Sequence, residues 1–180
     1  MRIKQAGARR AAITGAVLMA LSLVGMPQAS ADPVVESAFG GEHWTIELPN
    51  PFGVEVGNNL AFTARETVSG EVTGSWAYQQ TVEGETFRFV GRISCLNVYD
   101  GNRAKLGGVV TYSNDPTVPV GSFGWFQVFD NGQGETDPPD RSSLVGFGDE
   151  AANEAFCNSP NLPRFGPWDV QGNVSVATTG

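Results

Sequence analysis

Short runs of alternating apolar and polar residues fill the chain after residue 42 and predict β-strands. The runs are rich in β-branched and aromatic residues, and Gly, Asn, Asp and Pro separate them, as in all-β proteins. In residues 71–80, for example, Val72, Trp76 and Tyr78 share one side of an extended chain. The expected strands cover residues 43–48, 60–69, 71–80, 86–99, 104–113, 121–130, 144–147 and 169–177.

Turn and helix signals complete this pattern. Asp100-Gly101-Asn102 predicts a tight hairpin between two of the strands, because Gly and Asn tolerate the positive φ of such turns. Gly91, inside the longest expected strand, predicts a bulge or bend. Residues 149–156 are alanine-rich behind Asp149, a good N-cap, and form the expected helix. The sequence thus predicts an all-β domain, a single antiparallel barrel or sandwich of about eight strands with one short helix.

Residues 1–31 follow a different pattern. A basic start precedes an apolar run over residues 11–26, and Ala29-Ser30-Ala31 offers small residues for a signal peptidase. We therefore expect a signal peptide that is cleaved after Ala31, a secreted product and no membrane attachment after cleavage. The β domain is expected over residues 43–180, and residues 32–42 are expected to be either a disordered N-terminus or an edge strand.

Charge narrows the choice of partners. The chain has 11 basic and 19 acidic residues, and four of the basic residues but none of the acidic ones lie before residue 32. The expected mature domain keeps seven basic against 19 acidic residues, a net charge of −12. Such a surface repels phosphate backbones and anionic lipids, which excludes nucleic acid and membrane surfaces as partners. An extracellular protein or carbohydrate, cationic partners and divalent metals remain open.

Two cysteines, Cys95 and Cys157, are present in the whole chain. An even count in an exported protein predicts one disulfide, and the alternative is two free thiols or a reactive cysteine. A disulfide between Cys95 and Cys157 closes a long loop of the chain, which stabilises the folded state by about 4 kcal/mol in the chain-entropy treatment.

Catalytic motifs are missing from the sequence. The chain has one histidine, His43, and contains no C-x-x-C, H-E-x-x-H or G-x-S-x-G motif. We interpret His43 as an imidazole at a strand edge, and the alternative is a general base. No catalytic residue is predicted.

An acidic stretch after residue 129 is the candidate metal site. Asp130, Asn131, Glu135, Asp137 and Asp140 offer the hard oxygen ligands that Ca²⁺ prefers. Their spacing is not that of an EF-hand, so a solvated turn without a cofactor is the favoured interpretation.

Aromatic residues are the candidate ligand-binding surface. Trp44, Trp76, Tyr78 and Trp125 could stack on sugars or line a barrel pocket. Aromatic residues at alternating strand positions are more commonly part of a core, which is the favoured interpretation.

The second half of the domain carries a moderately specific pattern. It consists of Cys95-Leu96-x-Val98-x-Asp100-Gly101-Asn102-x-Ala104, Gly107-Gly108-Val109, Val128-x-Asp130-Asn131-Gly132, Cys157 and Gln171-Gly172-Asn173-Val174. This pattern resembles small secreted actinobacterial β-rich proteins of unassigned function. The resemblance implies a Cys-to-Cys staple and a hairpin sheet, and it supplies no catalytic residue.

Two functions fit these observations. The first is a non-enzymatic extracellular binding or structural module. The second is a small secreted hydrolase or isomerase that uses carboxylates in a barrel mouth. A deep pocket with two or more convergent acids favours the enzyme, whereas an interior filled with Phe, Trp and Val favours the module.

Overall fold

The computed structural model describes residues 32–48, 53–134, 136–159 and 166–179. These lie in one compact unit, Asp32–Gly180, so the expected signal peptide falls outside the described residues. The described part contains strands β1 (Val34–Glu47), β2 (Glu55–Thr67), β3 (Val72–Val82), β4 (Glu85–Tyr99), β5 (Arg103–Ser113), β6 (Phe123–Phe129), β7 (Arg141–Ser142), β8 (Gly146–Gly148), β9 (Trp168–Asp169) and β10 (Gln171–Thr178), and helix α1 (Glu150–Asn158).

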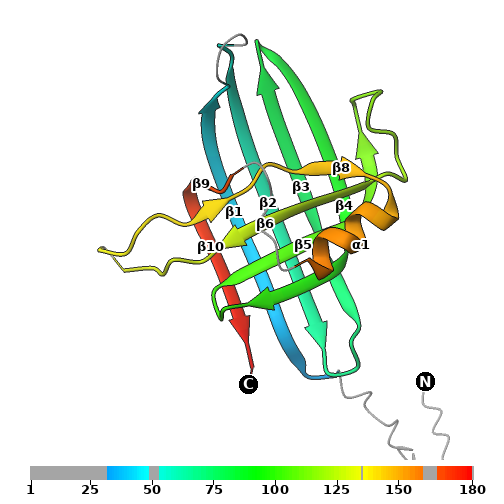
Figure 1. Ribbon diagram of the computed structural model, residues 1–180, viewed down its shortest axis with the longest axis vertical. Coiled ribbons are helices and arrows are strands. Elements are labelled where there is room, and N and C mark those ends of the chain that lie inside the picture. Colours follow the sequence, from blue (N-terminus) through cyan, green and yellow to red (C-terminus); the bar gives the residue numbers. More distant parts are fainter. Residues whose placement is uncertain (1–31, 49–52, 135, 160–165, 180) are drawn as a thin grey trace, which may run out of the picture. The chain divides into compact units, whose positions relative to one another are not determined.

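The strands form one antiparallel sheet that curls into a nearly closed barrel. Its strand order is β10-β1-β2-β3-β4-β5-β6-β7-β9, and β8 pairs with β6 beside β7. In Figure 1, β5 and β6 cross in front of the long strands β1 to β3, and α1 lies at one side. The predicted all-β class, antiparallel pairing and short helix are confirmed.

The first strand is longer than its sequence pattern indicates. Residues 34–42 belong to β1, where we expected a disordered segment or an edge strand. They pair with β10 on one side and with β2 on the other, so β1 is an interior strand of the sheet. The apolar alternation is weak in this segment because Gly40 and the inward-facing Glu36 and Glu42 interrupt its apolar face.

Even-numbered residues of β1 to β3 point into the barrel and form its core. The inward positions include Trp44, Leu60, Phe62 and Trp76, all at most 5% exposed. Phe62 meets Phe126 of β6 across the interior, with ring centroids 5.3 Å apart. The centre of the barrel is therefore filled with side chains.

The predicted hairpin and helix cap are both present. Asp100 and Gly101 have φ values of 54° and 77°, and Tyr99 pairs with Arg103 across the turn. Asp149 caps α1, since its Oδ1 accepts the Ala152 N–H at 2.8 Å. No helix in the described ranges has the length and apolarity to cross a membrane.

Strand β4 bends away from β3 halfway along its length. Its pairing with β3 stops at Ser75 and Arg92, and its register with β5 shifts between Val90 and Gly91 and again after Ile93. A Cβ at Gly91 would lie 2.2 Å from the Trp76 ring, so only glycine fits there, and the predicted bend at this residue is confirmed. Beyond the bend β4 pairs only with β5 among the described strands.

Candidate functional site

A cleft of about 720 Å³ opens where β3 and β4 separate. One side is the barrel mouth at the ends of β1, β2 and β3, the opposite side is the second half of β4, and α1 borders it beyond the disulfide. Its charged or amide-bearing lining residues are Glu36, Glu66, Asn97, Glu150, Asn153, Glu154 and Asn158. The cleft thus brings together parts of the chain that are far apart in sequence.

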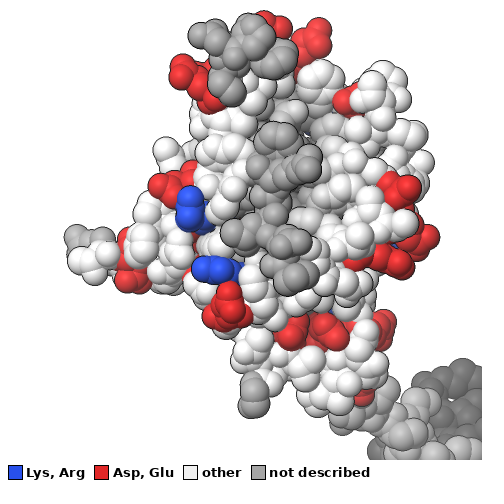
Figure 2. Space-filling model, viewed as in Figure 1, with Lys and Arg blue, Asp and Glu red and all other residues white. Residues whose placement is uncertain are grey.

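The cleft has a strongly negative lining. Four glutamates line it, Glu36, Glu66, Glu150 and Glu154, whereas no lysine or arginine of the described chain does. Glu36 and Glu66 are direct cross-strand partners. The side chains of Glu66, Glu150 and Glu154 form no ion pair or hydrogen bond with described residues. Figure 2 shows that acidic side chains also outnumber basic ones on the face of the molecule that it draws.

Glu36 is the most constrained of the four glutamates. Its Oε2 accepts the backbone N–H of Val98 in β4 at 3.0 Å, so it bridges β1 and β4. Partial burial raises the pKa of Glu36, the Val98 hydrogen bond lowers it and the neighbouring Glu66 charge raises it further. Glu36 therefore holds a proton more readily than an isolated glutamate.

A disulfide holds the helical wall of the cleft in place. Cys95 of β4 and Cys157 of α1 are bonded, with Cα atoms 6.5 Å apart, which confirms the predicted pairing. The Asn97 Nδ2 also donates to the Cys157 carbonyl at 2.8 Å. These two links fix α1 against the part of β4 that has left β3.

The candidate calcium ligands lie elsewhere, at the seam that closes the barrel. We call the seam the gap between β10 and the β6–β7 loop. Asp130 Oδ2 accepts the Val176 N–H at 2.9 Å, and Asp140 Oδ2 accepts the Val174 N–H at 2.7 Å. The two carboxylates accept backbone N–H groups on the outer edge of β10, as the carbonyl groups of a neighbouring strand would. Gln133 Nε2 completes the contact by donating to the Val174 carbonyl at 3.2 Å.

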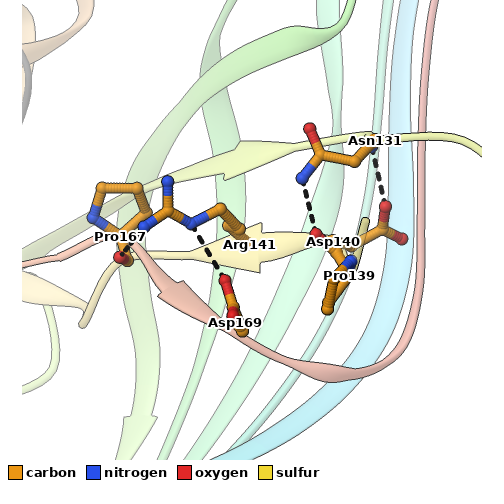
Figure 3. Close-up of polar contacts among 6 residues, drawn as sticks. All are labelled: Asn131, Pro139, Asp140, Arg141, Pro167 and Asp169. Atoms are coloured by element: carbon orange, nitrogen blue, oxygen red, sulfur yellow. Dashed lines mark hydrogen bonds and ion pairs between the residues drawn. The ribbon is translucent and has the colours of Figure 1, made fainter. Parts of the chain in front are cut away.

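The other oxygens of these two carboxylates order the loop itself. Asp140 Oδ1 accepts the Asn131 N–H at 2.8 Å, and Asp130 Oδ1 accepts the Gly132 N–H at 3.0 Å. Figure 3 shows the bond between the Asn131 N–H and Asp140, the bond from the Asn131 side chain to the Pro139 carbonyl, and the Arg141–Asp169 ion pair.

The remaining candidate ligands do not gather into a metal centre. Asp137 bonds to the Gly134 N–H at 2.7 Å, and Glu135 lies outside the described residues. In the described ranges no three His, Cys, Asp or Glu side chains are placed to hold a metal. The calcium hypothesis stays a prediction, and the structure gives Asp130 and Asp140 a role in barrel closure.

A buried acid, Glu42, faces the seam from inside the barrel. It is 5% exposed, and neither of its carboxylate oxygens has a donor at hydrogen-bonding geometry within the described chain. Burial raises the pKa of Glu42 to about 7, the nearby Ser142 hydroxyl partly offsets this rise, and the charge of Asp140 adds to it. Two acids thus share this corner of the barrel.

The aromatic candidates are packing residues. Trp44, Trp76 and Tyr78 are 5%, 1% and 2% exposed inside the barrel and present no ring face to solvent. Trp125 packs outside the barrel against Phe156 of α1, with ring centroids 6.2 Å apart. His43 lies on the outer surface, where its Nε2 is 2.9 Å from Gln171 Oε1. None of them lines the acidic cleft.

Sequence reasoning missed all four cleft glutamates, although a signal was present for one of them. Glu66 continues the inward parity of Leu60, Phe62 and Ala64, so an acid stands where the pattern calls for an apolar residue. A charge in phase with a core face is expensive unless it reaches solvent or a partner, and so marks a strand end or a site.

No family model, curated protein or solved structure matches this chain. The resemblance to secreted actinobacterial proteins therefore stays a prediction. The geometry and charge of the cleft are the features that bear on function.

Proposed function

We propose that this protein is a secreted, disulfide-stapled binding module that takes a cationic ligand in its acidic cleft. The signal peptide, removed after Ala31, exports it to the extracellular space. Sequencing of the exported protein should give an N-terminus at Asp32.

One observation carries the proposal. Four glutamates line a single cleft without a lysine or arginine among its described lining residues. Carboxylates that serve only solubility spread over a surface, and those that serve the fold pair with donors, as Asp130 and Asp140 do. Glu66, Glu150 and Glu154 do neither. A concave wall of one charge sign also concentrates ligands of the opposite sign by focusing its field.

The filled interior supports binding over catalysis inside the barrel. Trp76 and Phe126 are 1% and 0% exposed and fill the centre. A ligand therefore has to bind outside the centre of the barrel, as it would in the cleft at the mouth. An open cleft excludes little water, whereas catalysis by carboxylates usually relies on a sheltered site.

A hydrolase is the second candidate, and a specific observation favours it. Glu36 and Glu66 are cross-strand neighbours at the barrel mouth, and the pKa of Glu36 is raised. Two carboxyl groups at one site, one of which holds its proton more readily, are the arrangement that acid-base hydrolysis uses. Turnover of any aryl glycoside in a broad panel, lost in Glu36→Gln, would establish this alternative.

Titration calorimetry with spermine at low salt tests the binding proposal. Spermine should bind, and 300 mM NaCl should weaken it strongly because salt screens charge pairs. The double variant Glu150→Gln/Glu154→Gln should lose about tenfold in affinity, on the basis of about 0.7 kcal/mol for each charge pair lost.

The chain offers a matched control. Glu47 and Glu55 form the cross-strand pair at the opposite ends of β1 and β2, outside the cleft. Glu47→Gln/Glu55→Gln makes the same change in net charge and should leave affinity within twofold. Equal losses in both double variants would mean that spermine senses only the overall charge, and would overturn the proposal.

A further inference from the structure

We propose that the ligand of the acidic cleft is an extended lysine- or arginine-bearing polypeptide segment that adds as a strand to the free edge of β4. This inference rests on the proposed function and specifies its ligand. It commits to a peptide rather than to a small polyamine. Both the backbone edge of β4 and the cleft glutamates would contact this segment.

The second half of β4 has an edge with no neighbouring strand among the described residues. Pairing with β3 ends at Arg92, while pairing with β5 continues to Tyr99. The Val98 N–H points away from β5, because it donates to Glu36. Backbone polar groups alternate sides along a strand, so those of Leu96 lie on the same edge as Val98. Leu96 itself lines the cleft.

Glu36 shows that the N–H groups of this edge are available as donors. Its carboxylate accepts the Val98 N–H, as Asp130 and Asp140 accept N–H groups of β10 at the seam. At the seam, carboxylates accept both of two successive N–H groups along the edge of β10, those of Val174 and Val176. On the edge of β4, a carboxylate accepts one N–H group, that of Val98. Exposed strand edges with free N–H and C=O groups are templates for pairing with another chain.

Charge selects the occupant. From Ser94 to Val98 the edge spans about 14 Å, enough for a strand of about five residues. Alternate side chains of such a strand share one face, so a cation at every second position meets the glutamates of the lining. A second copy of this chain is disfavoured, because it would bring the same four glutamates against these.

Three peptides and spermine test the inference. The parent is an end-capped octapeptide of alternating Thr and Lys, which matches the charge of spermine. The other two carry N-methyl groups on either all four Lys or all four Thr amides. One of these two sets faces β4 in an added strand, and N-methylation removes its hydrogen bonds without changing the charge.

Strand addition predicts three results in calorimetry at low salt. The parent binds at least tenfold more tightly than spermine, one methylated peptide loses at least tenfold, and the other stays within threefold of the parent. In parallel, amide exchange at Leu96 slows with the parent peptide and is unchanged with spermine.

The negative outcomes separate the two proposals. If spermine binds and all three peptides bind within threefold of it, the strand inference is wrong and cation binding stands. If neither spermine nor any peptide binds, both proposals fail. Similar losses for both methylated peptides, without slower exchange at Leu96, also overturn strand addition.

Discussion

The barrel wall has a gap at the seam and another at the split between β3 and β4, and the acidic residues at the two gaps differ in how many backbone N–H groups they accept. At the seam between β10 and the β6–β7 loop, Asp130 and Asp140 fill the gap with carboxylates that accept the N–H groups of Val174 and Val176. At the split between β3 and β4, four glutamates surround a cleft, and one of them, Glu36, accepts a strand N–H.

The difference separates acids that serve the fold from acids left for a ligand. The carboxylate oxygens of Asp130 and Asp140 each accept a backbone N–H, and Asp140 is 6% exposed. Such charge-assisted bonds at a partly buried edge are stabilising. Glu66, Glu150 and Glu154 have no corresponding donor within the described chain, so they contribute charge without closing the wall.

The largest expected effect is at the seam. Asp140→Ala leaves the Val174 and Asn131 N–H groups without their acceptor, and each lost bond to a charged group costs about 1.5–3 kcal/mol. We expect a decrease of about 3–6 kcal/mol in the free energy of unfolding, measured by urea denaturation. Glu154→Gln in the cleft is the control, at about 0.5 kcal/mol or less. Equal effects at the two positions would remove the distinction between the gaps.

The covalent link beside the cleft should come next. Cys157→Ala removes the disulfide that holds α1 against β4, at a cost of about 4 kcal/mol for a loop of this length. The denaturation midpoint should fall, and the affinity for spermine should fall with it because the wall that carries Glu150 and Glu154 is no longer fixed. Unchanged affinity in the folded variant would show that α1 is not part of the site.

The pH dependence of stability should report on the seam. The pKa of Glu42 rises from 4.5 to about 7 on folding, so the folded state binds this proton more tightly than the unfolded state. Its stabilisation is present below pH 4.5 and is lost as the pH rises through 7, by up to about 3 kcal/mol at 1.36 kcal/mol per pKa unit. Glu42→Gln should flatten this part of the stability profile, measured by urea unfolding between pH 4.5 and 8. An identical profile in the variant would contradict the assignment to Glu42.

The smallest expected effect on stability is at the barrel mouth. Glu66→Gln removes the repulsion between Glu66 and Glu36, and should change the free energy of unfolding by about 0.5 kcal/mol or less, towards higher stability. It should nevertheless weaken spermine binding about threefold. A clear loss of stability would place Glu66 with the structural acids of the seam.

Local features were predictable from the sequence because neighbouring residues produce them. The turn at Asp100-Gly101 needs only residues that tolerate positive φ, and the helix needs only Asp149 before an alanine-rich segment. The pairing of Cys95 with Cys157 needs only that no other cysteine is present. The alternation of core residues in β2 and β3 likewise depends on positions two apart.

The roles of the acids required the fold. The role of the Asp140 carboxylate follows from the Val174 N–H that it accepts, and the role of Glu36 follows from the Val98 N–H. Each of these hydrogen bonds joins segments that lie far apart in the sequence. The sequence by itself determined the β class, the turn, the cap and the staple, because short-range geometry and composition suffice for them. Only the tertiary structure decided which acids close the barrel and which line the cleft, because that depends on which backbone donors the closing sheet leaves within reach.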